Sequence, residues 1–281
     1  MEMRTLRSPE QPEAYRSLWP GLSALLFLLL AGGGGLLLGD EPLSTHLDSR
    51  SLPPTFAHLF GTDWLGRDMF NRTVKGLGLS MAVGFLGAVS SSLIAAVVGL
   101  LAATMGRAAD RFLSWLTDLF LSVPNLVTLI LIAFVCGGGL KGIVIGIACT
   151  HWPSLARVVR AEMKQLRSSE YILVSRRLGK SRLWIARHHL LPHLVPQLLV
   201  GMLLMFPHAI LHEAAVTFIG LGMSPHQPAI GIILSESMRY LSTGMWWLAF
   251  FPGLCLLLMV RAFDTFGGMI QKLAGSSGHH D

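Results

Sequence analysis

The sequence predicts an all-α integral membrane protein with about six transmembrane helices. The 281 residues are 52% hydrophobic but only 14% charged, whereas soluble domains carry about 25% charged residues. Six apolar runs are also long enough to cross a bilayer as helices, which takes roughly 20 residues each. Strands of a membrane barrel need only about ten alternating residues, so runs of this length favour helices.

The predicted spans, in chain order, are residues 19–38, 79–105, 112–135, 139–160, 194–219 and 246–270. The first is an anchor that follows an N-terminal segment, 1–18. Its long apolar run and its mixed acidic and basic flank favour an uncleaved anchor over the alternative, a cleaved signal peptide. A loop, 39–76, separates the anchor from a domain of five spans, 77–270, and a tail, 271–281, follows that domain.

Charge predicts how these spans are oriented. An even number of spans places both termini on one side, and Lys and Arg concentrate in the segments on that side, above all in loop 168–193. Loops rich in Lys and Arg stay in the cytoplasm. We therefore expect both termini and loop 168–193 to be cytoplasmic, and loop 39–76 to be periplasmic.

Several function classes receive little support. The three cysteines lie in apolar stretches without the spacing of zinc ligands. The step Gly-Lys-Ser at 179–181 lacks the rest of a phosphate-binding loop, because Val174 stands where its first glycine belongs. Nucleic-acid binding would need a larger basic surface with aromatic platforms. His188, His189 and His193 leave metal binding open, although histidines beside an interface are more often structural.

Loop 168–193 has the pattern of two short helices joined by a turn. Gly179 is suited to end a first helix and Ser181 to cap a second, while Pro192 and Pro196 interrupt the chain before span five. Ile172 provides one of the apolar side chains and five Arg or Lys residues surround the turn. An exposed knob with some apolar surface is typical of a segment that inserts into a partner's groove.

The cytoplasmic end of span four carries a basic face. Arg157, Arg160, Lys164 and Arg167 recur at intervals of three and four residues, which places them on one side of a helix. Two interpretations stay open: side chains that reach toward lipid headgroups, or a basic wall at the mouth of a pathway.

The knob resembles the EAA loop of ABC-importer permeases, in the family that imports dipeptides, oligopeptides and nickel. Leu173, Val174 and Ser175 occupy the E-A-A positions themselves, so the resemblance rests on the flanking residues. Those that match are Glu170, Tyr171, Arg176, Leu178, Gly179, Ser181, Arg187, His188, Leu191 and Pro192.

Three further segments carry the same resemblance. "FGTDWLGRDMFNR" at 60–72 is similar to the family's G-T-D-x-x-G-R-D motif. "EAAVTFIGLGMSPHQPAIGIILSES" at 213–237 is similar to its S-F-L-G-L-G segment, with Ile230 in place of an aromatic residue, and 250–268 resembles its last span. The resemblance covers about residues 55 to 272.

This resemblance implies a type I ABC-importer permease fold in the cell inner membrane. It implies a transport subunit rather than an enzyme, with no tightly bound cofactor, because ATP is used by partner subunits. The implied partners are a second homologous permease subunit, two ATP-binding subunits, an extracytoplasmic substrate-binding protein and membrane lipid, with no nucleic acid. The knob would transmit movement of the ATPases to a pathway that opens alternately to each side.

Histidines in span five bear on the cargo. His208 and His212 lie four residues apart on one helical face, with Glu213 adjacent and His151 in span four. Such a pair is either a transient contact for a divalent cation or a hydrogen-bonded pair in the core. The histidine spacing and "ILVSRRL" at 172–178 resemble the nickel-permease C-type subunit. We therefore expect nickel or a metal–metallophore chelate as cargo, with dipeptides or oligopeptides as the alternative.

Two other classes explain less of the sequence. An intramembrane metalloprotease would need H-E-x-x-H, whereas "HAILHE" places its glutamate after the second histidine, on a neighbouring face. A structural membrane scaffold would explain the spans but leaves the basic knob without a purpose.

Overall fold

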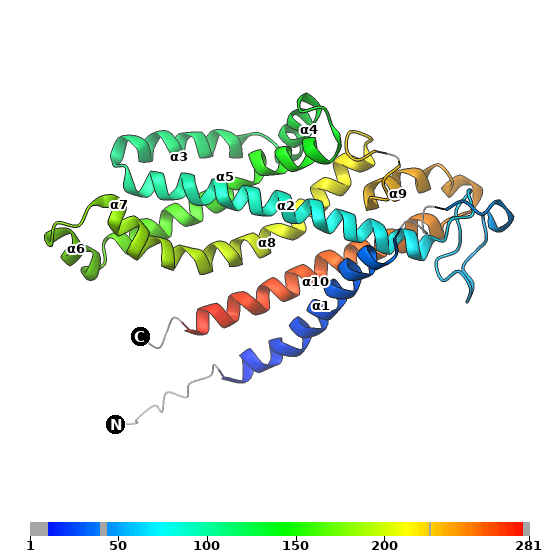
Figure 1. Cartoon of the computed structure of the whole chain (residues 1–281), viewed down its shortest axis with the longest axis horizontal. Coiled ribbons are helices and arrows are strands. Elements are labelled where there is room, and N and C mark those ends of the chain that lie inside the picture. Colours follow the sequence, from blue (N-terminus) through cyan, green and yellow to red (C-terminus); the bar gives the residue numbers. More distant parts are fainter. Residues whose placement is uncertain (1–10, 40–43, 225, 278–281) are drawn as a thin grey trace, which may run out of the picture.

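The computed structural model describes residues 11–39, 44–224 and 226–277. Within these ranges the chain is helical and has no β-strand, and its one isolated bridge pairs Thr62 with Asp68. Five of the described helices are long and apolar enough to cross a membrane, and a bent pair would make a sixth. Figure 1 shows these helices as an elongated bundle, with α6 and α7 at one end and α9 at the other. The predicted all-α membrane fold is confirmed.

Helix α1 (Gln11–Leu37) begins well before the predicted start at residue 19. Part of the expected N-terminal segment is therefore helical, and residues 1–10 lie outside the described part of the chain. Many of its leucines are exposed, as suits a helix at the lipid-facing edge of the bundle. Its glycines allow close approach to α2, because a Cβ added at Gly35 would meet the backbone of Gly78 at 3.1 Å.

Helix α10 (Trp247–Ser277) lies between α1 and α8 and packs against both (Figure 1). It continues past the predicted end at residue 270, so much of the expected tail 271–281 is helical. Residues 278–281 of that tail lie outside the described ranges.

Helix α2 (Met69–Thr104) starts ahead of the predicted residue 79, so part of the predicted loop 39–76 belongs to this helix. The helix starts here because Asp68 caps it: the Asn71 N–H donates to Asp68 Oδ1 at 3.0 Å. The part of the remaining loop that the structure describes, from residue 44 on, contains one 3₁₀ turn, η2 (Leu47–Ser49).

Helix α5 (Gly139–Arg167) packs along α2 through small residues. A Cβ added at Gly87 would lie 2.7 Å from the Ile147 side chain, and one at Gly99 would lie 2.4 Å from Val159. Spanning helices gain little from apolar burial against each other, so close contact through glycine is a main source of their association.

The third predicted span, 112–135, is not one straight helix. Helix α3 (Arg107–Ser122) and helix α4 (Asn125–Val135) meet at 94°. The break falls at Val123, which is extended with φ −97° and ψ 139° because Pro124 follows it. The apolar run continues through Pro124, so run length alone predicted one continuous span. The proline explains why the structure breaks there.

The knob holds helix α6 (Glu170–Arg177), helix α7 (Arg182–Ile185) and a π-helical turn, η3 (Ala186–Leu190). Helix α8 (Leu191–Phe218) follows without a break. The expectation that Pro192 and Pro196 interrupt the chain is wrong. Pro192 lies in the first turn of α8, and the π-helical turn ahead of it is the kind of local adjustment that accommodates missing proline N–H groups.

A short helix, α9 (Ile230–Met238), and a 3₁₀ turn, η4 (Leu241–Thr243), connect α8 to α10. The sequence analysis predicted no element here. Nine residues are too few to span a membrane, yet most of α9 is buried against α8, α10 and α2.

Candidate functional site: the knob and a histidine-lined cavity

The knob (residues 168–193) is held by local backbone interactions. Gly179 lies just past the end of α6 with φ 78°, a conformation that favours glycine. The Trp184 N–H donates to Ser181 Oγ at 3.1 Å, so Ser181 caps α7 as predicted. The helix–turn–helix predicted from the sequence is therefore confirmed.

The apolar side chains of the knob divide into two groups. Leu178 and Leu183 are 73% and 80% exposed, whereas Ile172 and Ile185 are buried. The expectation that Ile172 faces a partner is wrong, because its side chain is buried in the same apolar cluster as Val159 and other residues of the spanning helices. Buried residues thus anchor the knob, and its two leucines at the turn stay accessible.

The other predicted coupling residues lie on the knob's outer surface. Glu170 is the first residue of α6, and Pro192 is exposed at the start of α8. Tyr171, Arg176 and Arg187 are exposed as well.

The knob's histidines have protein partners. Ser175 Oγ lies 3.0 Å from His189 Nε2, and the His188 ring stacks on Trp184 at 4.4 Å between centroids. The Lys180 ammonium lies 4.6 Å from the Trp184 ring centroid. Among the described residues, no three His, Cys, Asp or Glu side chains gather in a way that could hold a metal ion.

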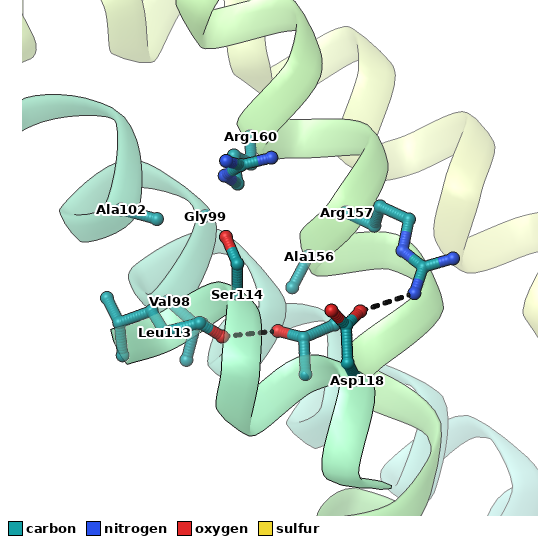
Figure 2. Close-up of a pocket in the computed structure, with 10 residues that line it drawn as sticks. Val98, Gly99, Ala102, Leu113, Ser114, Asp118, Ala156, Arg157 and Arg160 are labelled. Carbon is teal, nitrogen blue, oxygen red and sulfur yellow. Dashed lines mark hydrogen bonds and ion pairs between the residues drawn. The ribbon is translucent and has the colours of Figure 1, made fainter. Parts of the chain in front are cut away.

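The basic face of α5 pairs with α3. Arg157 Nη2 donates to Asp118 Oδ1 at 2.8 Å (Figure 2), and both Arg160 and Lys164 contact Asp110 at 2.5 Å. These ion pairs hold α3 against α5, and both interpretations made from the sequence stay open.

A cavity of about 430 Å³ opens between α5 and α8, and the start of α4 completes its wall. Three histidines line it: His151 from α5, and His208 and His212 from α8. His151 Nε2 and His212 Nδ1 lie 2.8 Å apart. The hydrogen-bonded pair is therefore formed across two helices, by His212 with His151, and His208 lies one turn away on the cavity wall.

Glu213 does not join this group. Its side chain is fully buried on another face of α8, and its Oε1 accepts a hydrogen bond from Thr217 at 2.9 Å. Consecutive residues of a helix point about 100° apart. Glu213 directly follows His212, so its side chain faces away from the histidines.

The opposite end of the bundle contains a buried ion cluster that the sequence analysis did not predict. Asp63 accepts from Arg67 Nε at 2.6 Å and from Arg72 Nη1 at 3.2 Å, and Arg72 Nη2 donates to Glu236 at 2.5 Å. The cluster ties the loop before α2 to α9. The sequence did mark these residues, because the two motif-like segments 60–72 and 213–237 each contribute members of the cluster. It did not show that the two segments meet.

Comparison with known proteins agrees with this architecture. Residues 95–274 match the family described as binding-protein-dependent transport system inner membrane component. The chain is 33% identical over 252 residues to the dipeptide transport system permease protein DppC of Bacillus subtilis (strain 168), which covers 89% of this chain and 79% of that protein. It is 34% identical over 243 residues to the oligopeptide transport system permease protein OppC of the same organism, covering 86% and 79%.

A third relative is the probable D,D-dipeptide transport system permease protein DdpC of Escherichia coli (strain K12). It is 31% identical over 249 residues, which cover 89% of this chain and 83% of that protein. These relatives carry peptide names, so the expectation that the nickel permeases are the nearest branch has no support. Similarity of this extent, together with the fold, identifies the chain as a multi-pass permease subunit of the ABC-importer family, a binding-protein-dependent transport system inner membrane component.

Proposed function

We propose that this subunit forms half of the transmembrane pathway of an ATP-driven importer of short peptides. The observation that carries the proposal is its extended similarity to permeases named for dipeptide and oligopeptide transport. The cavity of about 430 Å³ between α5 and α8 supports it, because small-molecule sites have volumes of about 300–1,000 Å³.

The partners follow from the same proposal. A second homologous permease subunit completes the pathway, two ATP-binding subunits supply the energy, and a substrate-binding protein delivers the peptide. The knob and both termini lie on the cytoplasmic side, in agreement with the distribution of Lys and Arg. The chain itself binds no cofactor tightly, and ATP acts in the partners.

The knob is the proposed docking element for an ATP-binding subunit. Leu178 and Leu183 provide exposed apolar side chains at its tip, and basic residues surround them. Gly179 and Ser181 set the turn that presents both leucines. Glu170, Tyr171, Arg176, Arg187 and Pro192 form the surrounding surface.

Nickel or a metal chelate is a second candidate cargo, and one observation favours it. His208 and His212 both line the cavity, and imidazole nitrogen is a ligand that suits nickel. Two such ligands give only weak coordination, which would suit a transient contact.

Uptake in cells tests both candidates. Cells that lack the gene, with and without a plasmid copy, would be given [¹⁴C]alanylalanine or ⁶³Ni²⁺ in separate assays. Peptide uptake that falls on deletion and returns with the plasmid supports the proposal. If peptide uptake does not change, while ⁶³Ni²⁺ uptake falls on deletion and returns with the plasmid, the cargo is metal and not peptide.

A further inference from the structure

A chain of hydrogen bonds fixes the protons of two histidines in the cavity wall. Thr150 Oγ1 donates to the Gly146 carbonyl oxygen at 2.8 Å, which uses its only proton. His151 Nδ1 lies 2.9 Å from the same hydroxyl. The hydroxyl must therefore accept there, so His151 carries its proton on Nδ1.

The second ring follows from the first. An ionised imidazole inside a membrane span is costly without a counter-charge, and Glu213 is buried on another face of α8. With both rings neutral, His151 Nε2 has no proton and accepts from His212 Nδ1 at 2.8 Å. His212 Nε2 is then left with a free lone pair at the cavity.

The rest of the cavity wall adds acceptors and no charge. Asn125 lines the cavity, and its Oδ1 is buried without a hydrogen-bond partner. His208, one helical turn from His212, is exposed and faces the same space. None of the described residues that line the cavity is Asp, Glu, Lys or Arg. A ligand group that carries donors can use these acceptors without meeting a charged side chain in the described wall, although the Asn125 amide and the Ser154 hydroxyl can also donate.

We propose that His208, His212 and Asn125 form an acceptor site for the protonated amino terminus of a transported peptide. An ammonium group has three donors, and its hydrogen bonds to neutral nitrogen and oxygen acceptors are charge-assisted. The carboxylate end of the peptide finds no cation in this wall. Without a carboxylate the site holds the ammonium weakly, as a pathway must if cargo is to move on. The inference rests on the proposed peptide cargo.

Two substitutions at one position separate the free acceptor from the packing of the ring. In His212→Asn, the amide nitrogen replaces Nδ1 and preserves donation to His151, but nothing replaces Nε2. In His212→Gln, the longer side chain places an amide at the Nε2 position. His208→Ala removes the neighbouring acceptor, and His226→Asn is the control because His226 is exposed in the loop after α8.

The assay uses the complete transporter in proteoliposomes, with its second permease, ATP-binding subunits and binding protein. Probes are [¹⁴C]alanylalanine and its N-acetyl form, each supplied at equal saturation of the binding protein as measured by titration. Co-purification of all subunits confirms that each variant assembles.

We expect His212→Asn and His208→Ala each to slow uptake of the free-amino peptide by roughly ten-fold, the effect of losing one charge-assisted hydrogen bond. Uptake of the acetylated peptide should not change, so the preference of the transporter for a free amino group falls. His212→Gln should stay within about three-fold of wild type, and His226→Asn should match it.

Equal loss for both probes, or no loss in assembled variants, would overturn the acceptor site while leaving peptide transport intact. Loss of ⁶³Ni²⁺ uptake in His212→Asn with unchanged peptide uptake would make these residues a metal contact instead. A wild-type transporter that assembles but carries neither peptide would refute the proposed cargo, and the acceptor site with it.

Discussion

The exposed leucines of the knob give the sharpest test of how this subunit meets its ATPase. Leu178 and Leu183 are 73% and 80% exposed, whereas Ile172, which lies in α6 ahead of both, is fully buried. Substitution of each residue by alanine therefore separates contact with a partner from stability of the permease itself.

The expected magnitude follows from these exposures. Full burial of a leucine side chain is worth about 1.5–3 kcal/mol. About three quarters of each exposed leucine remains available to a groove in the partner, and alanine keeps only its Cβ. We expect each substitution to cost about 1–2 kcal/mol of binding free energy, or roughly five- to thirty-fold in affinity.

Ile172→Ala should act differently. It removes buried contacts at the base of the knob, which costs about 2–5 kcal/mol of folding free energy in well-packed sites. This variant should lower the thermal midpoint of the purified permease, whereas Leu178→Ala and Leu183→Ala should not.

The assay is titration of the ATP-binding subunit onto the permease pair in lipid nanodiscs, followed by biolayer interferometry. Leu47→Ala is the matched control, because Leu47 is 62% exposed but lies in η2, in the loop before α2. Affinity equal to wild type in both leucine variants, with unchanged thermal midpoints, would refute docking through the tip of the knob.

Three further predictions concern the bundle. Asp63→Asn leaves the buried Arg72 with one carboxylate in place of two, and should destabilise the purified protein by about 3–5 kcal/mol in thermal unfolding. Gly99→Leu forces a side chain into Val159 and should reduce the folded yield and the thermal midpoint, because overpacking costs about 1–3 kcal/mol. Glu213→Gln should keep near-wild-type stability, since the amide preserves shape and an acceptor, whereas Glu213→Ala should lose about 2–4 kcal/mol through a cavity and an unpaired neighbour.

Patterns local in sequence predicted the helices and their caps well. Apolar run length located the spans, and Gly179 and Ser181 marked the turn of the knob because each acts on its own backbone or on residues nearby. The bend at Pro124 was also a local signal, but the length of the run outweighed it. The continuity of α8 through Pro192 depends on a π-helical turn, which no pattern in the sequence reveals.

Pairings across long separations could not be predicted. Arg72 and Glu236 are 164 residues apart, and His151 and His212 are 61 apart. Each pair exists because two helices come together at one depth and rotation, which periodicity does not determine. The same limit explains Ile172, whose spacing indicates an apolar face but not which surface covers that face.

Continuous packing joins the knob to the cavity. Ile172 at the base of the knob belongs to the same buried cluster as Val159 and Leu155 of α5, and Leu155 also lines the histidine cavity. Met205 packs against that cluster from α8 and faces the cavity as well. Close-packed interiors have low compressibility, and coupling between distant sites travels through contiguous contacts of this kind. If an ATPase docks on the knob as proposed, a displacement of α6 would act on the cavity wall through this one buried cluster.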